Sequence, residues 1–111
     1  MKIVRVTYTT KAEYAEHNQS NIKTVMADLQ KIGNAGINYN ACLNPDGKTF
    51  VHTAFFSSDE DEKVLMDLAS FQLFQKELRA SGLESPPKQE LPSLVGSSKE
   101  IFNGYAIAAW K

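Results

Sequence analysis

His52 is the side chain of this sequence best suited to acid–base chemistry. It lies in residues 37–57, INYNACLNPDGKTFVHTAFFS, among aromatic and polar neighbours. A neutral imidazole can accept or donate a proton, and Asn40 or Arg5 could orient the ring. As a catalytic general base it would need a pocket and a substrate within hydrogen-bonding reach. The simpler interpretation is a histidine buried in a subunit interface and paired with Asn40, because buried polar groups need partners in any case.

A second group of residues could bind a ligand without doing chemistry. On a helical projection Asn18 falls on the apolar side of its helix, so its amide would be buried and would need a partner. With Tyr8, Tyr39 and Thr53 it could line a cavity between helix and sheet that suits an aromatic or quinone-like molecule. The alternative is that Asn18 bonds to the backbone and the tyrosines fill the core.

No motif in the sequence predicts a metal site or a cofactor. The two histidines and the single cysteine, Cys42, are far apart and lack the spacing of metal ligands. Cys42 is interpreted as a small buried residue without a cationic neighbour to activate it. The acidic run 59–62 is read as the solvated start of a helix, where negative charge is favourable.

The elements that position these side chains centre on a predicted β-hairpin. Asn44-Pro45-Asp46-Gly47 suits a type I turn followed by a glycine bulge, flanked by strands rich in aromatic and β-branched residues. We expect Asn44 to lie opposite Lys48. Alternate side chains then share a face, and the face away from the core carries these residues: Asn38, Asn40, Cys42, Phe50, His52, Ala54 and Phe56.

The rest of the chain alternates strand and helix patterns. Residues 2–9 predict a strand, and Thr10 with Glu13 matches a capping box that opens a helix to about Ile32, stopped by Gly33. His17 projects away from the apolar stripe of this helix and should be exposed. A second helix should follow residue 58, break near residues 69–70 and end at Gly82.

The C-terminal part of the chain, residues 83–111, begins with a proline-rich segment. Residues 83–93 hold three prolines and predict an extended surface crossing, and residues 94–102 predict the fourth strand. Asn103-Gly104 is a hairpin signal, after which residues 105–110 form either a fifth strand or an arm on another subunit. We therefore divide the chain into a domain, residues 1–102, and a C-terminal extension, residues 103–111.

This order, β-α-β-β-α-β, is that of a ferredoxin-like α+β domain, a four-stranded antiparallel sheet with both helices on one face. The other face, with Arg5, Thr7, His52 and the residues named above, would be bare in a monomer. We expect a second copy to cover it in a two-fold homodimer.

Composition limits the classes of function. A chain of 111 residues is long enough for one domain with its own core. A net charge of -1 gives no positive electrostatic potential that would attract nucleic acid or an anionic membrane. No apolar run approaches the length of a membrane helix, and no leader segment is evident. With one cysteine, a reducing cytoplasm is the simple expectation.

Over about residues 2–102 the sequence resembles the dimeric α/β-barrel superfamily, within it small proteins similar to antibiotic biosynthesis monooxygenases. The resemblance lies in these segments: KIVRVTYT, NQSNIKTVMADL, DGKTFVHTAF, SFQLFQKEL and LVGSS. It implies a homodimer whose two sheets form a barrel, and a pocket between sheet and helices in each subunit. Such proteins include cofactor-free oxygenases and haem-degrading enzymes. The asparagine, tryptophan and helix histidine of the latter are not matched, because Trp110 lies in the tail and His17 should project outward.

Two functional hypotheses follow, and the sequence leaves open whether the protein is an enzyme. The first is a cofactor-free, monooxygenase-like protein acting on an apolar or aromatic small molecule, which Asn18, Tyr8 and Tyr39 orient while His52 moves a proton. The second is a non-catalytic homodimeric binding or accessory module. Only the first hypothesis requires a cavity between helix and sheet that is larger than one or two water molecules.

Overall fold

A computed structural model of the chain describes residues 1–102. Its elements, in order, are β1 (Lys2–Thr9), the 3-10 turn η1 (Ala12–Tyr14), α1 (Ala15–Ile32), β2 (Ile37–Leu43), β3 (Thr49–Phe56), α2 (Asp59–Met66), α3 (Ala69–Ala80) and β4 (Ser85–Glu90). The C-terminal extension, with its predicted hairpin turn and fifth strand or arm, lies outside the described residues.

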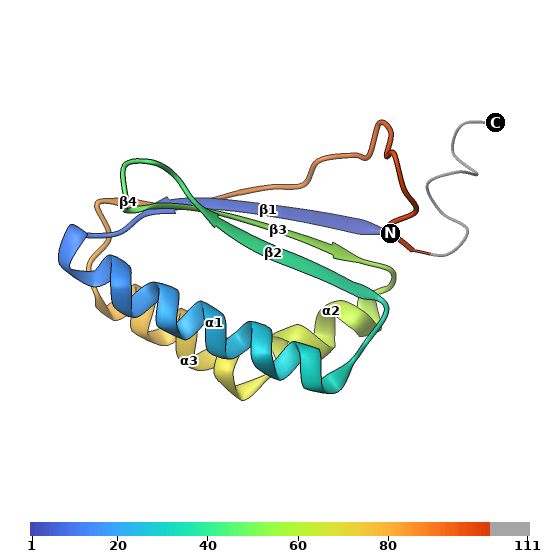
Figure 1. Ribbon diagram of the computed structural model, residues 1–111, viewed down its shortest axis with the longest axis horizontal. Helices are drawn as coiled ribbons and strands as arrows, with labels where there is room; N and C mark the ends of the chain where they lie inside the picture. The colour runs from blue at the N-terminus through green and yellow to red at the C-terminus, as the bar shows by residue number, and fades with distance from the viewer. Residues whose placement is uncertain (103–111) are drawn as a thin grey trace.

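The strands form one antiparallel sheet in the order β2-β3-β1-β4. Figure 1 shows α1, α2 and α3 together on one side of this sheet. We call the side of the sheet beneath the helices the inner face and the other side the open face. The predicted ferredoxin-like fold, with two layers and βαββαβ order, is confirmed.

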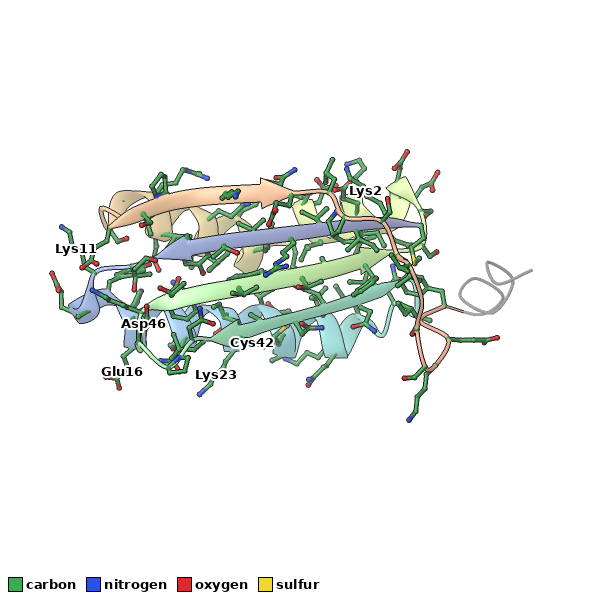
Figure 2. All side chains as sticks on the ribbon, turned by 90° about the horizontal axis from the view of Figure 1, so that it is seen from above. Lys2, Lys11, Glu16, Lys23, Cys42 and Asp46 are labelled. Carbon is green, nitrogen blue, oxygen red and sulfur yellow. The ribbon has the colours of Figure 1, made fainter. Side chains whose placement is uncertain are left out.

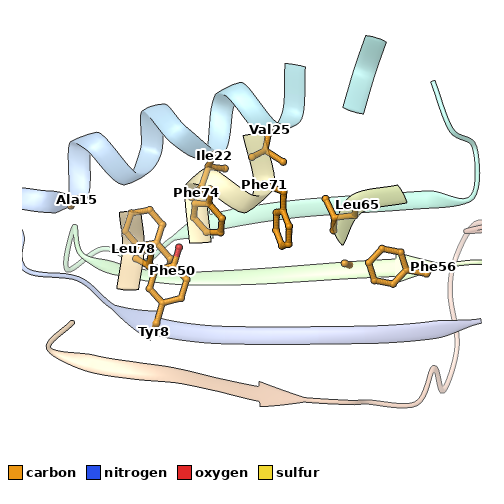
Figure 3. Close-up of a cluster of buried hydrophobic side chains, with 11 residues drawn as sticks. Tyr8, Ala15, Ile22, Val25, Phe50, Phe56, Leu65, Phe71, Phe74 and Leu78 are labelled. Atoms are coloured by element: carbon orange, nitrogen blue, oxygen red, sulfur yellow. The ribbon is translucent and has the colours of Figure 1, made fainter. Parts of the chain in front are cut away.

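The core lies between the inner face and the helices. Phe50 and Phe56 of β3 are almost completely buried there, in one cluster with Val25 of α1 and Phe71 of α3. Figure 3 shows these rings directed from the sheet and the helices into the same layer. Burying a large apolar side chain stabilises a fold by about 1.5–3 kcal/mol, so this layer holds the helices on the sheet.

The predicted register of the hairpin was wrong by one residue. The turn itself is as expected, since Gly47 has φ 76° and its amide donates to Asn44 O at 3.0 Å. However, Asn44 N donates to Thr49 O at 2.8 Å, so Asn44 lies opposite Thr49 and not Lys48. The Asp46 carboxylate accepts from the amides of Lys48 and Thr49, which keeps Lys48 inside the loop.

A one-residue shift turns every side chain of β3 to the other face. Phe50, His52 and Phe56 therefore point beneath the helices, not onto the open face as we predicted. Val51, Thr53 and Phe55 take their place on the open face. Arg5, Thr7, Asn38, Asn40 and Cys42 do lie there, and Cys42 is exposed, not buried.

Both long helical segments end as predicted, but α1 does not begin as predicted. The capping box of Thr10 and Glu13 does not form; the Thr10 hydroxyl donates to Lys48 O at 3.3 Å, and residues 12–14 make a 3-10 turn before α1. Thr10 is thus used to anchor the hairpin loop. Gly33 ends α1 with φ 66°, and the second helix is broken between α2 and α3.

The fourth strand was also misplaced. It is Ser85–Glu90, in the segment expected to be a surface crossing, and not residues 94–102. Two prolines are tolerated because β4 is an edge strand, where a missing amide donor can face away from the sheet. The following chain crosses the open face near the start of β1 (Figure 2) and reaches Phe102, which is buried.

No helix within residues 1–102 combines the length and apolar character that crossing a bilayer requires.

The adjacent residues Phe55 and Phe56 test the observed register. We expect Phe56→Ala to lower the free energy of unfolding by about 3–5 kcal/mol, because it leaves a cavity in the core. Phe55→Ala, on the open face, should cost much less. Urea denaturation measures both variants. If Phe55→Ala destabilised the protein more than Phe56→Ala, the observed register would be excluded and the register predicted from the sequence would be supported.

Candidate functional site

A pocket of about 300 Å³ lies between the inner face of the sheet and helices α2 and α3. Most of its lining is apolar: Val4, Val6, Ala54 and Phe56 from the sheet, with Leu65, Phe71, Phe74 and Leu78 from the helices. Tyr8, Tyr39 and His52 supply polar atoms to it. The exposed part of the lining, which marks the mouth, comes from α2, α3 and β4: Met66, Arg79, Pro87 and Gln89.

Four side chains from four elements form a buried chain of hydrogen bonds, which we call the polar chain. Asn18 of α1 donates through Nδ2 to Tyr8 Oη of β1 at 2.8 Å. Tyr8 Oη lies 2.7 Å from His52 Nε2 of β3, and Tyr39 Oη of β2 lies 2.6 Å from His52 Nδ1. The corrected register makes this possible, since His52 pairs across the sheet with Val6 and Ala41 and so sits between the two tyrosines.

The hydrogens of the polar chain can be assigned in one consistent direction. Tyr8 Oη accepts from Asn18, and we assign its own hydrogen to Nε2 of His52, which is unprotonated in this assignment. A neutral imidazole then carries its hydrogen on Nδ1 and donates it to Tyr39 Oη. In this assignment the polar chain does not use the hydroxyl hydrogen of Tyr39.

Burial keeps every member of the polar chain neutral. Removal from water lowers the pKa of His52 to about 4, and no charged group among residues 1–102 is found to oppose this shift. The same desolvation raises the pKa of Tyr39 and Tyr8 above the ordinary phenol value, although the hydrogen bond from Asn18 opposes it at Tyr8. The ring of His52 also packs 5.5 Å from that of Phe74. At neutral pH the polar chain therefore holds protons without charge.

Asn18 is fully buried, as its place on the helical stripe predicted. It shares that stripe with Ala15, Ile22 and Val25. Its Oδ1 atom has no hydrogen-bond partner among residues 1–102. An unpaired buried carbonyl oxygen lowers the free energy of unfolding by about 1–3 kcal/mol. The hydrogen bond from Nδ2 to Tyr8 and the packing around Asn18 must offset this loss.

Four of the predicted site residues come together and three do not. Asn18, Tyr8, Tyr39 and His52 form the polar chain. Thr53, Asn40 and Arg5 lie on the open face, so they do not reach the pocket. The prediction that Asn40 or Arg5 orients His52 was wrong because it depended on the register that placed His52 on their face; the two tyrosines orient it instead.

The residues of the mouth were not identified from the sequence. Gln75, which lines the pocket inside the mouth, was also missed; it interrupts the apolar stripe of α3 in the way that Asn18 interrupts that of α1, and this signal could have found it. Pro87 and Gln89 gave no such signal, because the segment was not expected to join the sheet.

The other ionisable groups do not build a second site. His17 is exposed, as predicted, and its Nε2 lies 3.0 Å from Glu77 Oε1. Residues 1–102 contain no group of three histidine, cysteine, aspartate or glutamate side chains arranged to hold a metal ion.

No protein-family model matches the sequence, and no curated protein sequence matches it. Solved structures do match the fold. A candidate antibiotic biosynthesis monooxygenase from Bacteroides thetaiotaomicron superposes with a TM-score of 0.77 at 7% identity, over 89% of this chain and 93% of that one. Another from Deinococcus radiodurans gives a TM-score of 0.67 at 16% identity, over 90% and 98% of the two chains.

SnoaB, a cofactor-independent oxygenase from Streptomyces nogalater whose structure was solved in variant form, is also similar. Its TM-score is 0.63 at 15% identity, over 89% of this chain and 96% of that one. At these identities the likeness establishes the fold. The chain therefore has the architecture of antibiotic biosynthesis monooxygenase structures, as its sequence resemblance implied.

Proposed function

We propose that the pocket binds an apolar or aromatic small molecule and that the protein acts on it as a cofactor-free, monooxygenase-like enzyme. The observation that carries the proposal is the pocket of about 300 Å³, apolar over most of its lining and bordered by the polar chain. A concave apolar site with a few convergent polar groups is the usual form of a small-molecule site. The similarity to oxygenase structures supports the choice of reaction.

In this proposal Tyr39 is the group that meets the ligand. Its free hydroxyl hydrogen suits an acceptor oxygen, such as the carbonyl of an aromatic ketone or quinone. When negative charge develops on that oxygen, Tyr39 donates to it, and the hydrogen bond from His52 Nδ1 strengthens the donor. Asn18 and Tyr8 keep the proton of His52 on Nδ1. A histidine with a pKa of about 4 is a weak base, so His52 serves this role better than outright proton abstraction.

This arrangement fits a reaction in which the substrate itself supplies all the electrons that reduce molecular oxygen. The CH₂ of an anthrone-type ring, which is conjugated with the ketone across that ring, loses a proton to solvent water and gives an enolate, whose oxygen Tyr39 stabilises. Molecular oxygen then oxidises that carbon, so that CH₂ and O₂ become C=O and H₂O, with no external reductant. Thr53, Asn40 and Arg5 take no part, because they lie on the other face.

One observation favours the non-catalytic alternative. Both ring nitrogens of His52 are already bonded to tyrosines, as in a structural histidine whose hydrogen bonds are complete. A binding or accessory module would keep the pocket and the ligand preference but would not consume oxygen. Oxygen uptake with anthrone, which becomes anthraquinone and water, distinguishes the two functions.

The open face supports the further proposal of a homodimer. Val51 and Phe55 are half-buried and contribute apolar surface there, among threonines and asparagines. This mixed character suits an interface with a second sheet better than open water. An exposed free thiol at Cys42 suits a reducing compartment, which supports our proposal of a cytoplasmic location.

Ligand preference tests the role of Tyr39. Thermal unfolding with tetralone, an aromatic ketone, and with tetralin, which lacks the carbonyl, should show tetralone bound about 3–10-fold more tightly, the value of one hydrogen bond. Tyr39→Phe should abolish this preference and leave tetralin binding unchanged. If neither compound raised the melting temperature, the pocket would not be a site for such ligands. An unaltered preference in Tyr39→Phe would remove Tyr39 from the mechanism.

The buried neutral His52 should make stability depend on pH. Its folded pKa, about 4, lies below the ordinary value of 6.5, so protons bind preferentially to the unfolded chain. Its contribution is complete above pH 6.5 and is lost, by roughly 3 kcal/mol, as the pH falls toward 4. Urea denaturation between pH 5 and 6.5 should show this slope in the wild type and in the control His17→Gln, but not in His52→Gln. Equal slopes in all three proteins would mean that His52 is not buried as described.

The dimer is tested by sedimentation at micromolar concentration. We expect a dimer, which Thr53→Arg on the open face should weaken by at least tenfold by placing like charges across the interface. Thr24→Arg, on the exposed side of α1, is the matched control. A monomeric wild type, or equal effects of the two substitutions, would contradict a sheet-to-sheet dimer.

A further inference from the structure

The two edges of the sheet are built differently. β4, SPPKQE, carries two prolines and two charged residues, which protect an edge against pairing with another strand. β2, INYNACL, carries neither a proline nor a charge. Its outer edge has no strand partner among residues 1–102. An unprotected edge of this kind is suited to bind one more strand.

A groove runs along this edge between β2 and α1. One hollow of about 490 Å³ includes Ile22, Met26, Ala41 and Leu43 in its lining. A second, of about 390 Å³, lies toward the start of β2 and is bordered by Leu29, Ile37 and Asn38, among others. Met26, Gln30 and Tyr39 line both hollows, so the two are consecutive parts of one groove.

The described part of the chain ends inside this groove. Ile101 and Phe102 line the hollow at the start of β2, and Phe102 is only 7% exposed. Residues 103–111, NGYAIAAWK, follow directly and include the six-residue apolar run YAIAAW. Nine extended residues span ~30 Å, whereas the seven residues of β2 span ~23 Å, so the segment is long enough to follow the whole strand.

We propose that residues 103–111 occupy the groove of their own chain as a fifth strand parallel to β2. They begin beside Ile37 and must run toward Leu43, which makes the pairing parallel. Residues 91–102, which follow β4 and cross the open face, carry the chain to this edge of the sheet (Figure 2). The strand satisfies the free edge of β2 and covers Met26 and Leu43. It also shields the groove side of Tyr39, the end of the polar chain, from solvent.

Cys42 allows a direct test because it is the single cysteine, is exposed and lines the groove. Ala106→Cys, Ile107→Cys and Ala108→Cys are made one at a time in the full-length protein and oxidised with glutathione disulfide. Neighbouring strands bring Cα atoms within the range that a disulfide spans. We expect an intramolecular disulfide with Cys42, and positions 106 and 108 should differ from 107, because side chains alternate along a strand.

Two controls set the background of the crosslinking experiment. Leu73→Cys places a thiol on the exposed side of α3, and each tail variant is repeated with Cys42→Ser. The proposal predicts a disulfide at least tenfold faster in the best tail variant than in Leu73→Cys. A disulfide-linked dimer would show that the groove receives the tail of a second copy, and rates equal to the Leu73→Cys control would show that the tail does not occupy it. Either result overturns the proposal.

Trp110 gives an independent readout, since it is the single tryptophan. Docked in the groove, it should emit at shorter wavelength than free tryptophan and resist quenching by acrylamide. Leu43→Glu, in the groove, should expose it, whereas Leu91→Glu, at a position already 62% exposed, should not. Solvent-like emission from Trp110 in the wild type would contradict a docked tail.

Discussion

The hydrogen bond from Asn44 N to Thr49 O decides which face of β3 lies beneath the helices. Because side chains alternate along a strand, this one pairing places Phe50 and Phe56 in the core and His52 between Tyr8 and Tyr39. A shift of one residue would put all three on the open face and break the polar chain. The loop around Asp46 thus controls both the stability of the core and the chemistry of the pocket, although it lies far along the chain from α3 and its rings.

The sequence predicted the architecture and part of the site for separable physical reasons. Helical spacing and terminal glycines identified the helices, and Asn18 on an apolar stripe identified a buried amide correctly. The hairpin register could not be obtained in the same way, because the Asn44–Gly47 turn is compatible with more than one loop length. That single error moved His52 to the wrong face and, with it, assigned Asn40 and Arg5 to partner roles.

The last strand shows the other limit of sequence reasoning. Its prolines predicted a loop, and only the tertiary position at a sheet edge makes Ser85–Glu90 a strand. Because β4 supplies Pro87 and Gln89 to the mouth of the pocket, the mouth could not be placed without the strand. Here the hydrogen bonds that β4 makes with β1 outweigh the low strand propensity of its prolines.

The chemistry of the site depends on neutrality. A charged histidine in this layer would be costly, and burial removes that charge by lowering the pKa of His52 to about 4. Two phenols, one imidazole and one amide are joined by hydrogen bonds, and the assigned direction of these bonds ends in a donor at Tyr39. Such a chain can support charge that develops on a bound molecule without holding charge itself.

The most direct test of this account is the protonation state of His52, observed by the ¹⁵N resonances of its ring in the full-length protein. We expect a neutral imidazole at pH 7 with the hydrogen on Nδ1, unchanged until the pH falls toward 4. A hydrogen on Nε2 at pH 7, or a ring that titrates near the ordinary pKa of 6.5, would contradict the buried, directed chain on which the proposed function rests.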